Sequence, residues 1–332
     1  MSGHTVAFIP SPSISGLHLG PLFVHFYGLM YVVAIALAIY ITRRRWAAAG
    51  GDPSLVSDVA IWAVPAGLIG ARLYFDITTP FDITPKHVWW GPLAIWNGGL
   101  GVWGGILAGA LVGAWRVRRS GASVPEFMDA IAPALLVAQG IGRIGNYFDQ
   151  QLFGKPSALP WALEISKAAR MSSGLPGQYL KYTTFQPSFL YELIFDLIFA
   201  AVLVWLGHHT SIRPPGLFAL YVAGYSGYRI FEETIRIDSS AYFLGLRLNF
   251  FVAICVTVTG LVWFAISQRK RKAVAGGAAV LAIGVLCALA AGCSNGHANT
   301  TATRTVSART AQTAAARHSP SSHRPGAMSS RA

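Results

Sequence analysis

The chain has 332 residues, of which 53% are hydrophobic and only 12% are charged, and its mean hydropathy is +0.48. Soluble domains carry about a quarter charged residues, so this composition excludes an ordinary water-soluble globular protein. The formal net charge of +13 comes mainly from a basic run at 269–272 and from arginines in a tail without acids, which leaves no basic face for nucleic acid and excludes it as a partner.

Apolar runs of membrane-spanning length dominate the chain. A bilayer-spanning helix needs ~20 predominantly apolar residues. The sequence therefore predicts an all-α polytopic membrane protein with seven transmembrane helices and an eighth near the C-terminus. In chain order, the candidate spans are 22–42, 55–77, 93–115, 125–148, 187–207, 215–233, 244–266 and 274–292.

The basic residues predict the orientation, because Lys and Arg concentrate in cytoplasmic loops. If the spans alternate, the basic clusters 43–45, 116–119 and 269–272, with Arg213, fall on one side. The N-terminus then lies outside, and without Lys or Arg before residue 43 it lacks the basic region of a cleavable signal peptide. Segment 149–186, of mixed polarity and with several turn formers, also falls outside and is expected to form a small extracytoplasmic cap.

Three parts of the chain are expected. Residues 1–268 form the seven-span domain, residues 269–293 contain the basic run and a further apolar segment, and residues 294–332 are too poor in apolar side chains to pack and are expected to be disordered. The three cysteines lie in or beside apolar segments at spacings that indicate neither a zinc site nor a disulfide framework. No metal site is predicted.

Ionisable side chains inside spans are costly and usually mark a functional site. With the predicted orientation, most of them fall near the outer ends of four spans. They are Arg72, Arg143, Glu192, Asp196, Arg229, Glu232, Glu233 and Arg236. Because arginine grips phosphate through a two-pronged fork and stays charged when buried, an anionic lipid headgroup is a candidate ligand.

Helical spacing groups several of these residues. Tyr225, Arg229, Glu233 and Arg236 are separated by four, four and three positions and form one stripe, in which Arg229 and Glu233 can pair and leave Arg236 free or facing the cap. Asn146 follows Arg143 by three positions, on the same face. The alternative is that the charges are structural ion pairs. For Arg72 both alternatives stay open, whereas glycine- and amide-rich surroundings favour function for Arg143 and Arg229.

Glycines mark two further stretches. GIGRIG (140–145) fits the dinucleotide pattern G-x-G-x-x-G but follows an apolar span rather than a strand, so that kind of site is excluded. In WNGGLGVWGG (96–105), which includes Gly98 and Gly99, the glycines permit close helix packing or a re-entrant kink. Alternatively, they offer backbone N–H groups or space to a bulky lipid.

An ordered set of motifs resembles the bacterial prolipoprotein diacylglyceryl transferase family. The motifs are HFYGLMY (25–31), WNGGLGVWGG (96–105), GIGRIGNYFDQQLFG (140–154), QPSFLYE (186–192) and GYSGYRIFEETIRID (224–238). The resemblance implies a seven-span enzyme of the bacterial plasma membrane that needs no cofactor. Its implied partners are the lipid bilayer, phosphatidylglycerol, and prolipoprotein signal peptides with a lipobox cysteine. The diacylglyceryl group is transferred to that cysteine as a thioether, and glycerol phosphate is released.

The resemblance also implies roles for individual residues. Arg143 and Arg229 match the essential arginines that hold the lipid phosphate, and with Tyr27 they are the predicted catalytic residues. Asn146 and Gly154 match signature residues, and Tyr225, Glu233 and Arg236 match positions important in the family. Together with the intramembrane charges and the glycines, the predicted substrate-binding residues are Arg143, Asn146, Gly154, Gly98, Gly99, Glu192, Tyr225, Glu233, Arg236 and Arg72.

Two positions depart from the family pattern. Trp103 stands where better-known members have a histidine proposed as the general base, and Gln151 stands where they have a glutamate. The base is therefore left open, with Tyr27 and Glu233 as candidates. Since the positive field of the arginines favours the thiolate of the substrate, the need for a strong base is reduced.

Two alternative functions and one terminal feature complete the hypotheses. An anion transporter would use the same arginines but usually has inverted repeats. Other lipid-headgroup enzymes usually need a carboxylate-bound metal, and neither pattern is visible in the sequence.

After the basic run, AVAGGAAVLAIGVLCALAAGC (273–293) resembles a lipoprotein signal ending at Cys293, with Ala290 in place of the preferred leucine. The length of this apolar segment favours an eighth membrane span over a lipoprotein signal.

Overall fold

The computed structural model describes residues 8–20, 22–80, 90–95, 98–238 and 240–269. The predicted eighth span, Cys293 and the tail 294–332 lie outside these ranges. Within them are seven long helices, α1 (Phe26–Ala48), α2 (Pro53–Thr78), α3 (Val102–Arg119), α4 (Val124–Phe148), α6 (Ser188–His209), α7 (Gly216–Ile235) and α8 (Leu248–Gln268). The short elements are strands β1 (Gly16–Leu19), β2 (Leu22–His25), β3 (Leu163–Glu164), β4 (Thr184–Phe185), β5 (Tyr242–Phe243) and β6 (Leu246–Arg247), helix α5 (Lys167–Ser172), and the 3-10 turns η2 (Gly91–Leu93) and η4 (Gly177–Tyr179).

Five helices, α1, α2, α4, α6 and α8, are long and apolar enough to cross a membrane. Helices α3 and α7 are less apolar because each carries three charged residues in its C-terminal half. The prediction of a mostly helical membrane protein with several spans is therefore confirmed. Membrane crossing by α3 and α7 stays a prediction.

Local signals in the sequence set several helix ends. Helix α2 begins after Asp52, whose carboxylate accepts a hydrogen bond from the Ser54 amide at 2.8 Å, and Pro53 occupies the first turn, where no N–H is needed. The predicted span 93–115 begins too early, since α3 starts only at Val102. Gly98 and Gly99, with φ of 82° and 78°, adopt the left-handed conformation. A right-handed helix therefore cannot continue through them, and α3 starts after them.

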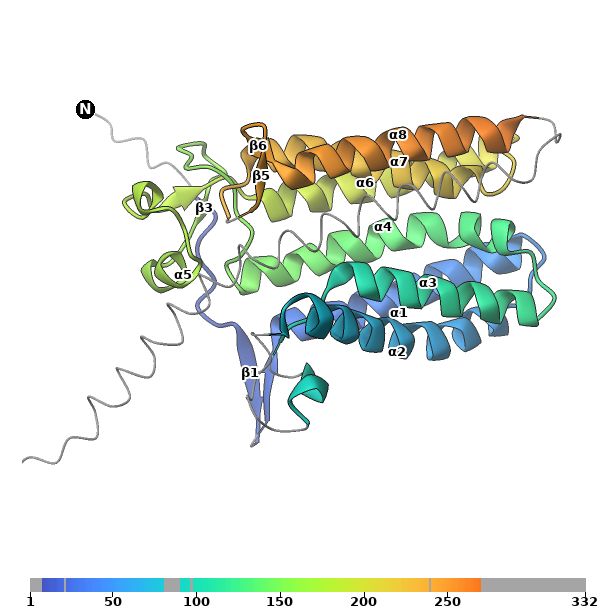
Figure 1. Cartoon of the computed structure of the whole chain (residues 1–332), viewed down its shortest axis with the longest axis horizontal. Helices are drawn as coiled ribbons and strands as arrows, with labels where there is room; N and C mark the ends of the chain where they lie inside the picture. Colours follow the sequence, from blue (N-terminus) through green and yellow to red (C-terminus); the bar gives the residue numbers. More distant parts are fainter. Residues whose placement is uncertain (1–7, 21, 81–89, 96–97, 239, 270–332) are drawn as a thin grey trace, which may run out of the picture.

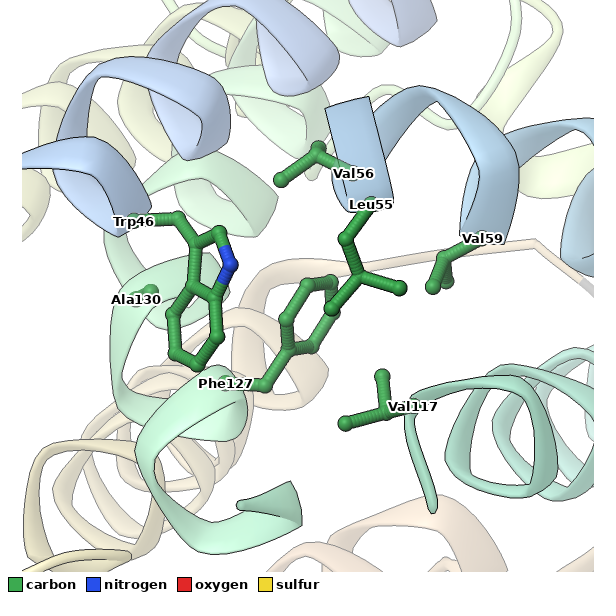
Figure 2. Close-up of a cluster of buried hydrophobic side chains, with 7 residues drawn as sticks. All are labelled: Trp46, Leu55, Val56, Val59, Val117, Phe127 and Ala130. Carbon is green, nitrogen blue, oxygen red and sulfur yellow. The ribbon is translucent and has the colours of Figure 1, made fainter. Parts of the chain in front are cut away.

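Helix α4 lies at the centre of the bundle (Figure 1). On one side it packs against α1, which is followed by α2 and α3, and on the other side it packs against α6 and α7, with α8 on α7. Trp46 of α1, Leu55 of α2 and Phe127 of α4 belong to one apolar cluster that joins these helices (Figure 2). In it the Trp46 and Phe127 rings meet edge to face with centroids 5.4 Å apart. A second apolar cluster, which includes Leu136 and Leu203, joins α4 to α6. These contacts fix α4 and α6 relative to each other.

Glycines allow α2 and α3 to approach closely. A Cβ atom at Gly104 would overlap the Gly70 carbonyl oxygen, and one at Gly70 would lie 2.6 Å from the Gly104 carbonyl oxygen. Gly105 lies against Gly67 on the same interface. Since small residues let helix backbones approach in a membrane, the close-packing interpretation of Gly104 and Gly105 is confirmed.

The two ends of the bundle differ in character. The three two-stranded sheets gather at one end (Figure 1). One of them, β3–β4, belongs with α5 to segment 149–186, here called the cap segment. The cap segment has its own apolar core, in which the Phe153 and Phe185 rings lie 4.7 Å apart. Helices α1, α3 and α8 end at the opposite end of the bundle, where their C-terminal basic residues lie.

Candidate active site

Arg143 on α4 binds Glu192 on α6 through two prongs. Its Nη2 lies 2.7 Å from Glu192 Oε1, and its Nε lies 2.6 Å from Glu192 Oε2. The Arg143 Nη1 atom has a longer contact of 3.4 Å with the side-chain oxygen of the buried Asn146. The predicted placement of Arg143 and Asn146 on one face is therefore confirmed.

Helix α7 presents the predicted stripe to this pair. The Tyr225 hydroxyl donates to Glu192 Oε1 at 2.8 Å. Arg229 is bound by Glu233 through Nη2 and by Glu232 through Nη1, at 2.6 Å in each case, and its Nη1 lies 3.8 Å from Glu192 Oε2. The expected Arg229–Glu233 pair is confirmed, and Glu192 links the two arginines.

Of the two alternatives for Arg236, a free side chain is contradicted, whereas a position facing the cap segment is confirmed by its bridge with Gly154. Its guanidinium forms a two-pronged contact with Asp238, with both N–O distances 2.8 Å, and its Nη1 lies 3.7 Å from Glu233. The reason is that α7 ends at Ile235, so Arg236 leaves the helix and turns toward the acid two positions later. Burial opposes the charge on Asp238, but hydrogen bonds and positive charge from Arg236 and Arg247 outweigh it and lower the pKa of Asp238.

The sequence analysis missed Arg247. This residue precedes α8, and its Nε lies 2.7 Å from Glu233 Oε2 while its Nη1 donates to the Asp238 carbonyl at 2.6 Å. Burial works against the charged form, yet Asp238 and Glu233 raise the pKa of Arg247 above its ordinary value. Arg247 falls within the predicted span 244–266, close to its start, where an arginine resembles an ordinary helix-end cation. Its position inside an apolar run is the signal that could have found it.

The network contains as many arginines as acids, but the side chains of Arg143 and Arg229 are more exposed than the acids that bind them. Arg143, Arg229, Arg236 and Arg247 face Glu192, Glu232, Glu233 and Asp238. The side chains of Arg143 and Arg229 are 21% and 19% exposed, whereas those of Glu192 and Glu233 are fully buried. The two arginine side chains are therefore the partly exposed members of these pairs, and the Glu192 and Glu233 carboxylates that bind them are buried.

Tyr27 reaches the same end of α4 from α1. Its ring lies so close to Gly145 that a Cβ atom there would be 2.8 Å from Tyr27 Cδ2. The Tyr27 hydroxyl lies 3.1 Å from the Tyr31 hydroxyl, and the residue also interacts electrostatically with Arg143. Gly145, two residues after Arg143, therefore provides the space that brings Tyr27 to the site.

Gly154 joins the cap segment to the end of α7. It forms an antiparallel bridge with Arg236, and its amide donates to the Gln186 carbonyl at 2.9 Å. The next amide, Lys155 N–H, donates to the Ile235 carbonyl at 2.8 Å. A Cβ atom at Gly154 would lie 3.0 Å from the Gln186 side chain and 3.2 Å from the Ile235 carbonyl oxygen. This contact sets the position of the cap segment next to Arg236.

Arg72 binds the backbone of the segment before α3. Its guanidinium donates to the carbonyls of Gly91, Pro92, Gly98 and Gly99 at 2.5–3.1 Å, and its Nε lies 3.2 Å from Asp76. Among the described residues, Arg72 shares no partner with Arg143 or Arg229. The structure therefore places Arg72, Gly98 and Gly99 together, in a group separate from the ion-pair network.

Cavities and metal-binding groups add little to the site. Within the described ranges, no group of three or more His, Cys, Asp or Glu side chains is placed to hold a metal ion. A cavity of about 200 Å³ lies beside the network, in the cap segment, and its lining includes Gln151 and Asp238. Trp103 lies half-buried near the start of α3. The side chains that the site brings together carry guanidinium, carboxylate, phenol and amide groups.

Comparisons with known proteins agree with the motifs. A family model described as prolipoprotein diacylglyceryl transferase matches residues 15–266. The phosphatidylglycerol–prolipoprotein diacylglyceryl transferase of Frankia alni is 43% identical over 79% of this chain and 68% of its own length. The phosphatidylglycerol–prolipoprotein diacylglyceryl transferase 2 of Streptomyces coelicolor is 38% identical over 81% of this chain and 84% of its own length. The transferase of that name from Bifidobacterium adolescentis is 41% identical over 81% of this chain and 82% of its own length. The chain belongs to the prolipoprotein diacylglyceryl transferase family.

Proposed function

We propose that this protein transfers the diacylglyceryl group of phosphatidylglycerol to the lipobox cysteine of prolipoproteins. The reaction forms a thioether and releases glycerol phosphate. The observation that carries the proposal is the pair Arg143 and Arg229, linked through Glu192 and bound by fully buried carboxylates, while both arginine side chains stay partly exposed. That arrangement suits a phosphodiester, which brings a single negative charge.

The proposed role of the arginines follows from the charge that develops in the reaction. The thiolate attacks the glyceryl carbon bonded to the phosphate oxygen, and the C–O bond breaks, so negative charge grows on the leaving phosphate. Fixed positive groups in a poorly hydrated site stabilise such charge strongly. Arg143 and Arg229 supply them, while Glu192 and Glu233 hold both guanidinium groups in place before substrate arrives.

Further residues have supporting proposed roles. Tyr225 and Asn146 contact the Arg143 guanidinium, Tyr27 interacts with it electrostatically, and all three are proposed to orient the substrate. Arg236 and Gly154 are proposed to form the border toward the cap segment, where the signal peptide would enter. For Arg72, Gly98 and Gly99, the contacts favour the structural alternative over direct substrate binding.

We further propose how the protein sits in its membrane. All seven long helices, α3 and α7 included, span the bacterial plasma membrane, with the N-terminus and the cap segment outside. Support comes from the basic residues Arg45, Arg116 and Arg269, which lie at the bundle end opposite the cap segment, as expected for cytoplasmic loops. The active site then lies toward the outer leaflet.

The alternatives are less well supported. An anion transporter would hold its charges near the midplane, whereas Arg143 and Arg229 lie within the last two turns of α4 and α7, at the cap end. Another lipid-headgroup enzyme finds no support in the family match. Thiol-dependent release of glycerol phosphate distinguishes the proposed reaction from both alternatives.

The test uses purified protein, phosphatidylglycerol and a lipobox peptide, and it follows glycerol phosphate release. We expect release with the cysteine peptide, none with a serine peptide, and a loss of at least about 100-fold in Arg143→Ala, the magnitude typical of a lost transition-state donor. Arg116→Ala is the matched control, because Arg116 pairs with Asp58 at the other end of the bundle. Absence of release from native, folded protein would contradict the proposal.

A further inference from the structure

Asp196 is a buried carboxylate without a hydrogen-bond partner. It lies on α6, one helical turn below Glu192, and its side chain is fully buried. Among the described residues, neither of its carboxylate oxygens has a hydrogen-bond partner. Because burying a polar group without a partner is costly, this exception needs an explanation.

The surroundings of Asp196 belong to the active site. A Cβ atom at Gly140, one turn before Arg143 on α4, would lie 3.3 Å from Asp196 Cβ, so α4 and α6 are in close contact at Asp196. The Tyr228 hydroxyl is also buried and, within the described part of the chain, unpartnered. The charged and titratable groups that interact with Asp196 are Glu192 on α6, Arg143 on α4, and Tyr221, Tyr225, Tyr228, Arg229 and Glu232 on α7.

The other acids of the site are committed to arginines. Glu192 holds Arg143 through both oxygens, Glu232 holds Arg229, and Glu233 lies between Arg229 and Arg247, all at 2.6–2.7 Å. A carboxylate whose charge is shared with guanidinium groups accepts a proton poorly. Asp196 is near the same arginines but forms no ion pair with them in the described part of the chain. It is therefore the acid best placed to accept a proton.

We propose that Asp196 is the general base that accepts the thiol proton of the substrate cysteine. The proposal rests on the proposed transferase function. In the step, the S–H proton moves to an Asp196 carboxylate oxygen, and the sulfur lone pair forms the S–C bond. The C–O bond to the phosphate oxygen breaks, and its electron pair leaves with glycerol phosphate. The proton then passes from Asp196 to the released phosphate or to water.

The test compares Asp196→Asn with the native protein across a range of pH. Asparagine matches the size of aspartate and can replace a neutral, structural acid, but it cannot act as a base. General bases contribute about 10²–10⁴-fold, so we expect kcat at neutral pH to fall by at least about 100-fold with the KM for phosphatidylglycerol within about threefold. The loss should shrink above pH ~8.5, where the thiol ionises unaided.

Two controls make the result specific. Asp52→Asn should keep native kcat, because Asp52 caps α2 at the opposite end and asparagine caps equally well. A selenocysteine peptide, whose selenol is already ionised at neutral pH, should react with Asp196→Asn nearly as fast as with native protein. Native kcat in Asp196→Asn with the cysteine peptide, or an equal loss with the selenocysteine peptide, would overturn the proposal.

The outcomes remain separable if the variant does not fold. In that case Asp196→Glu carries the test, since it keeps a carboxylate on α6 but displaces it. Its kcat should fall with the cysteine peptide and stay near native with the selenocysteine peptide, and an equal loss with both peptides would refute the base. Failure of the native protein to release glycerol phosphate from either peptide would instead count against the transferase function.

Discussion

Single arginines in this protein have different tasks, and Arg72 is the one whose task is most easily separated from catalysis. Its planar guanidinium reaches carbonyl oxygens of four residues before α3. Lysine, which carries its donors on one nitrogen, cannot span these acceptors. Loss of one hydrogen bond to a charged group costs about 1.5–3 kcal/mol.

Arg72→Lys should therefore lower the stability of the protein. We expect a lower thermal unfolding temperature in detergent, with an unchanged KM for phosphatidylglycerol in the fraction that stays folded. Arg43→Lys, at an exposed position, is the matched control and should leave both quantities unchanged. A raised KM with native thermal stability would instead indicate that Arg72 binds substrate.

The sequence predicts the residues of the network only where charge interrupts an apolar run. Arg143, Glu192 and Arg229 stand out because they lie within spans, and the contacts between them are present in the structure. Arg247 lies at the start of the predicted span 244–266, where an arginine resembles an ordinary helix-end cation, and Asp238 lies outside the predicted spans. The binding of Arg247 to Glu233 and to Asp238 was therefore not predicted. That information lies in the turn after α7 rather than in helical spacing.

At the scale of helices, too, the sequence predicts only part of what the structure shows. Hydropathy predicts most of α2, α4 and α6 but starts the third span several residues early, because it does not register left-handed backbone at Gly98 and Gly99. It also gives no indication that α4 is the central helix. Which helices touch depends on small residues and side-chain shape.

The α2–α3 interface gives the first prediction at this scale. Gly104→Ala places a methyl group against the backbone of Gly70, which cannot move without shifting α2. Overpacking of this kind costs about 1–3 kcal/mol, so the thermal unfolding temperature should fall. Gly28→Ala in α1 is the control and should not destabilise, because no atom of the described chain lies within 4 Å of the position that its Cβ would take. Equal behaviour of the two variants would argue against close packing at Gly104.

The connection between α7 and α8 gives a pH prediction. Because the pKa of Asp238 is lowered by Arg236 and Arg247 despite its burial, its contribution to stability is present above the unfolded-state pKa of about 3.9 and is lost as the pH falls through the lower folded-state value. Native protein should thus lose stability below about pH 4. In Asp238→Asn the loss should be smaller, and stability at pH 7 should be lower by roughly 1–3 kcal/mol.

Thermal unfolding of both proteins between pH 3 and pH 7 checks this expectation. The difference between the two curves isolates Asp238 from the other acids of the network, which are present in both proteins. Asp58→Asn, which removes an acid paired with Arg116 at the other end of the bundle, serves as a control for loss of a carboxylate. A difference between native protein and Asp238→Asn that stays constant down to pH 3 would show that the carboxylate contributes through shape rather than charge.

At the scale of the whole molecule, the separation of the two bundle ends links fold to function. Cap segment, hairpins and arginine network share one end, and the basic helix ends share the other. A secreted substrate cysteine has to meet a lipid phosphate, so the reaction needs the site on the outer side. Only one of the two orientations of the bundle in the membrane satisfies this requirement together with the distribution of basic residues.

Thiol labelling in bacterial spheroplasts tests that orientation. In a background with Cys255, Cys287 and Cys293 replaced by serine, Gly177→Cys reports on the cap segment and Ser120→Cys reports on the turn between α3 and α4; both positions are exposed. A membrane-impermeant maleimide should label residue 177 in intact spheroplasts and residue 120 only after permeabilisation, because the bilayer separates the two ends. The reverse pattern would place the arginine network on the cytoplasmic side, where secreted thiols do not reach it, and labelling of both residues in intact spheroplasts would contradict a bundle that crosses the membrane.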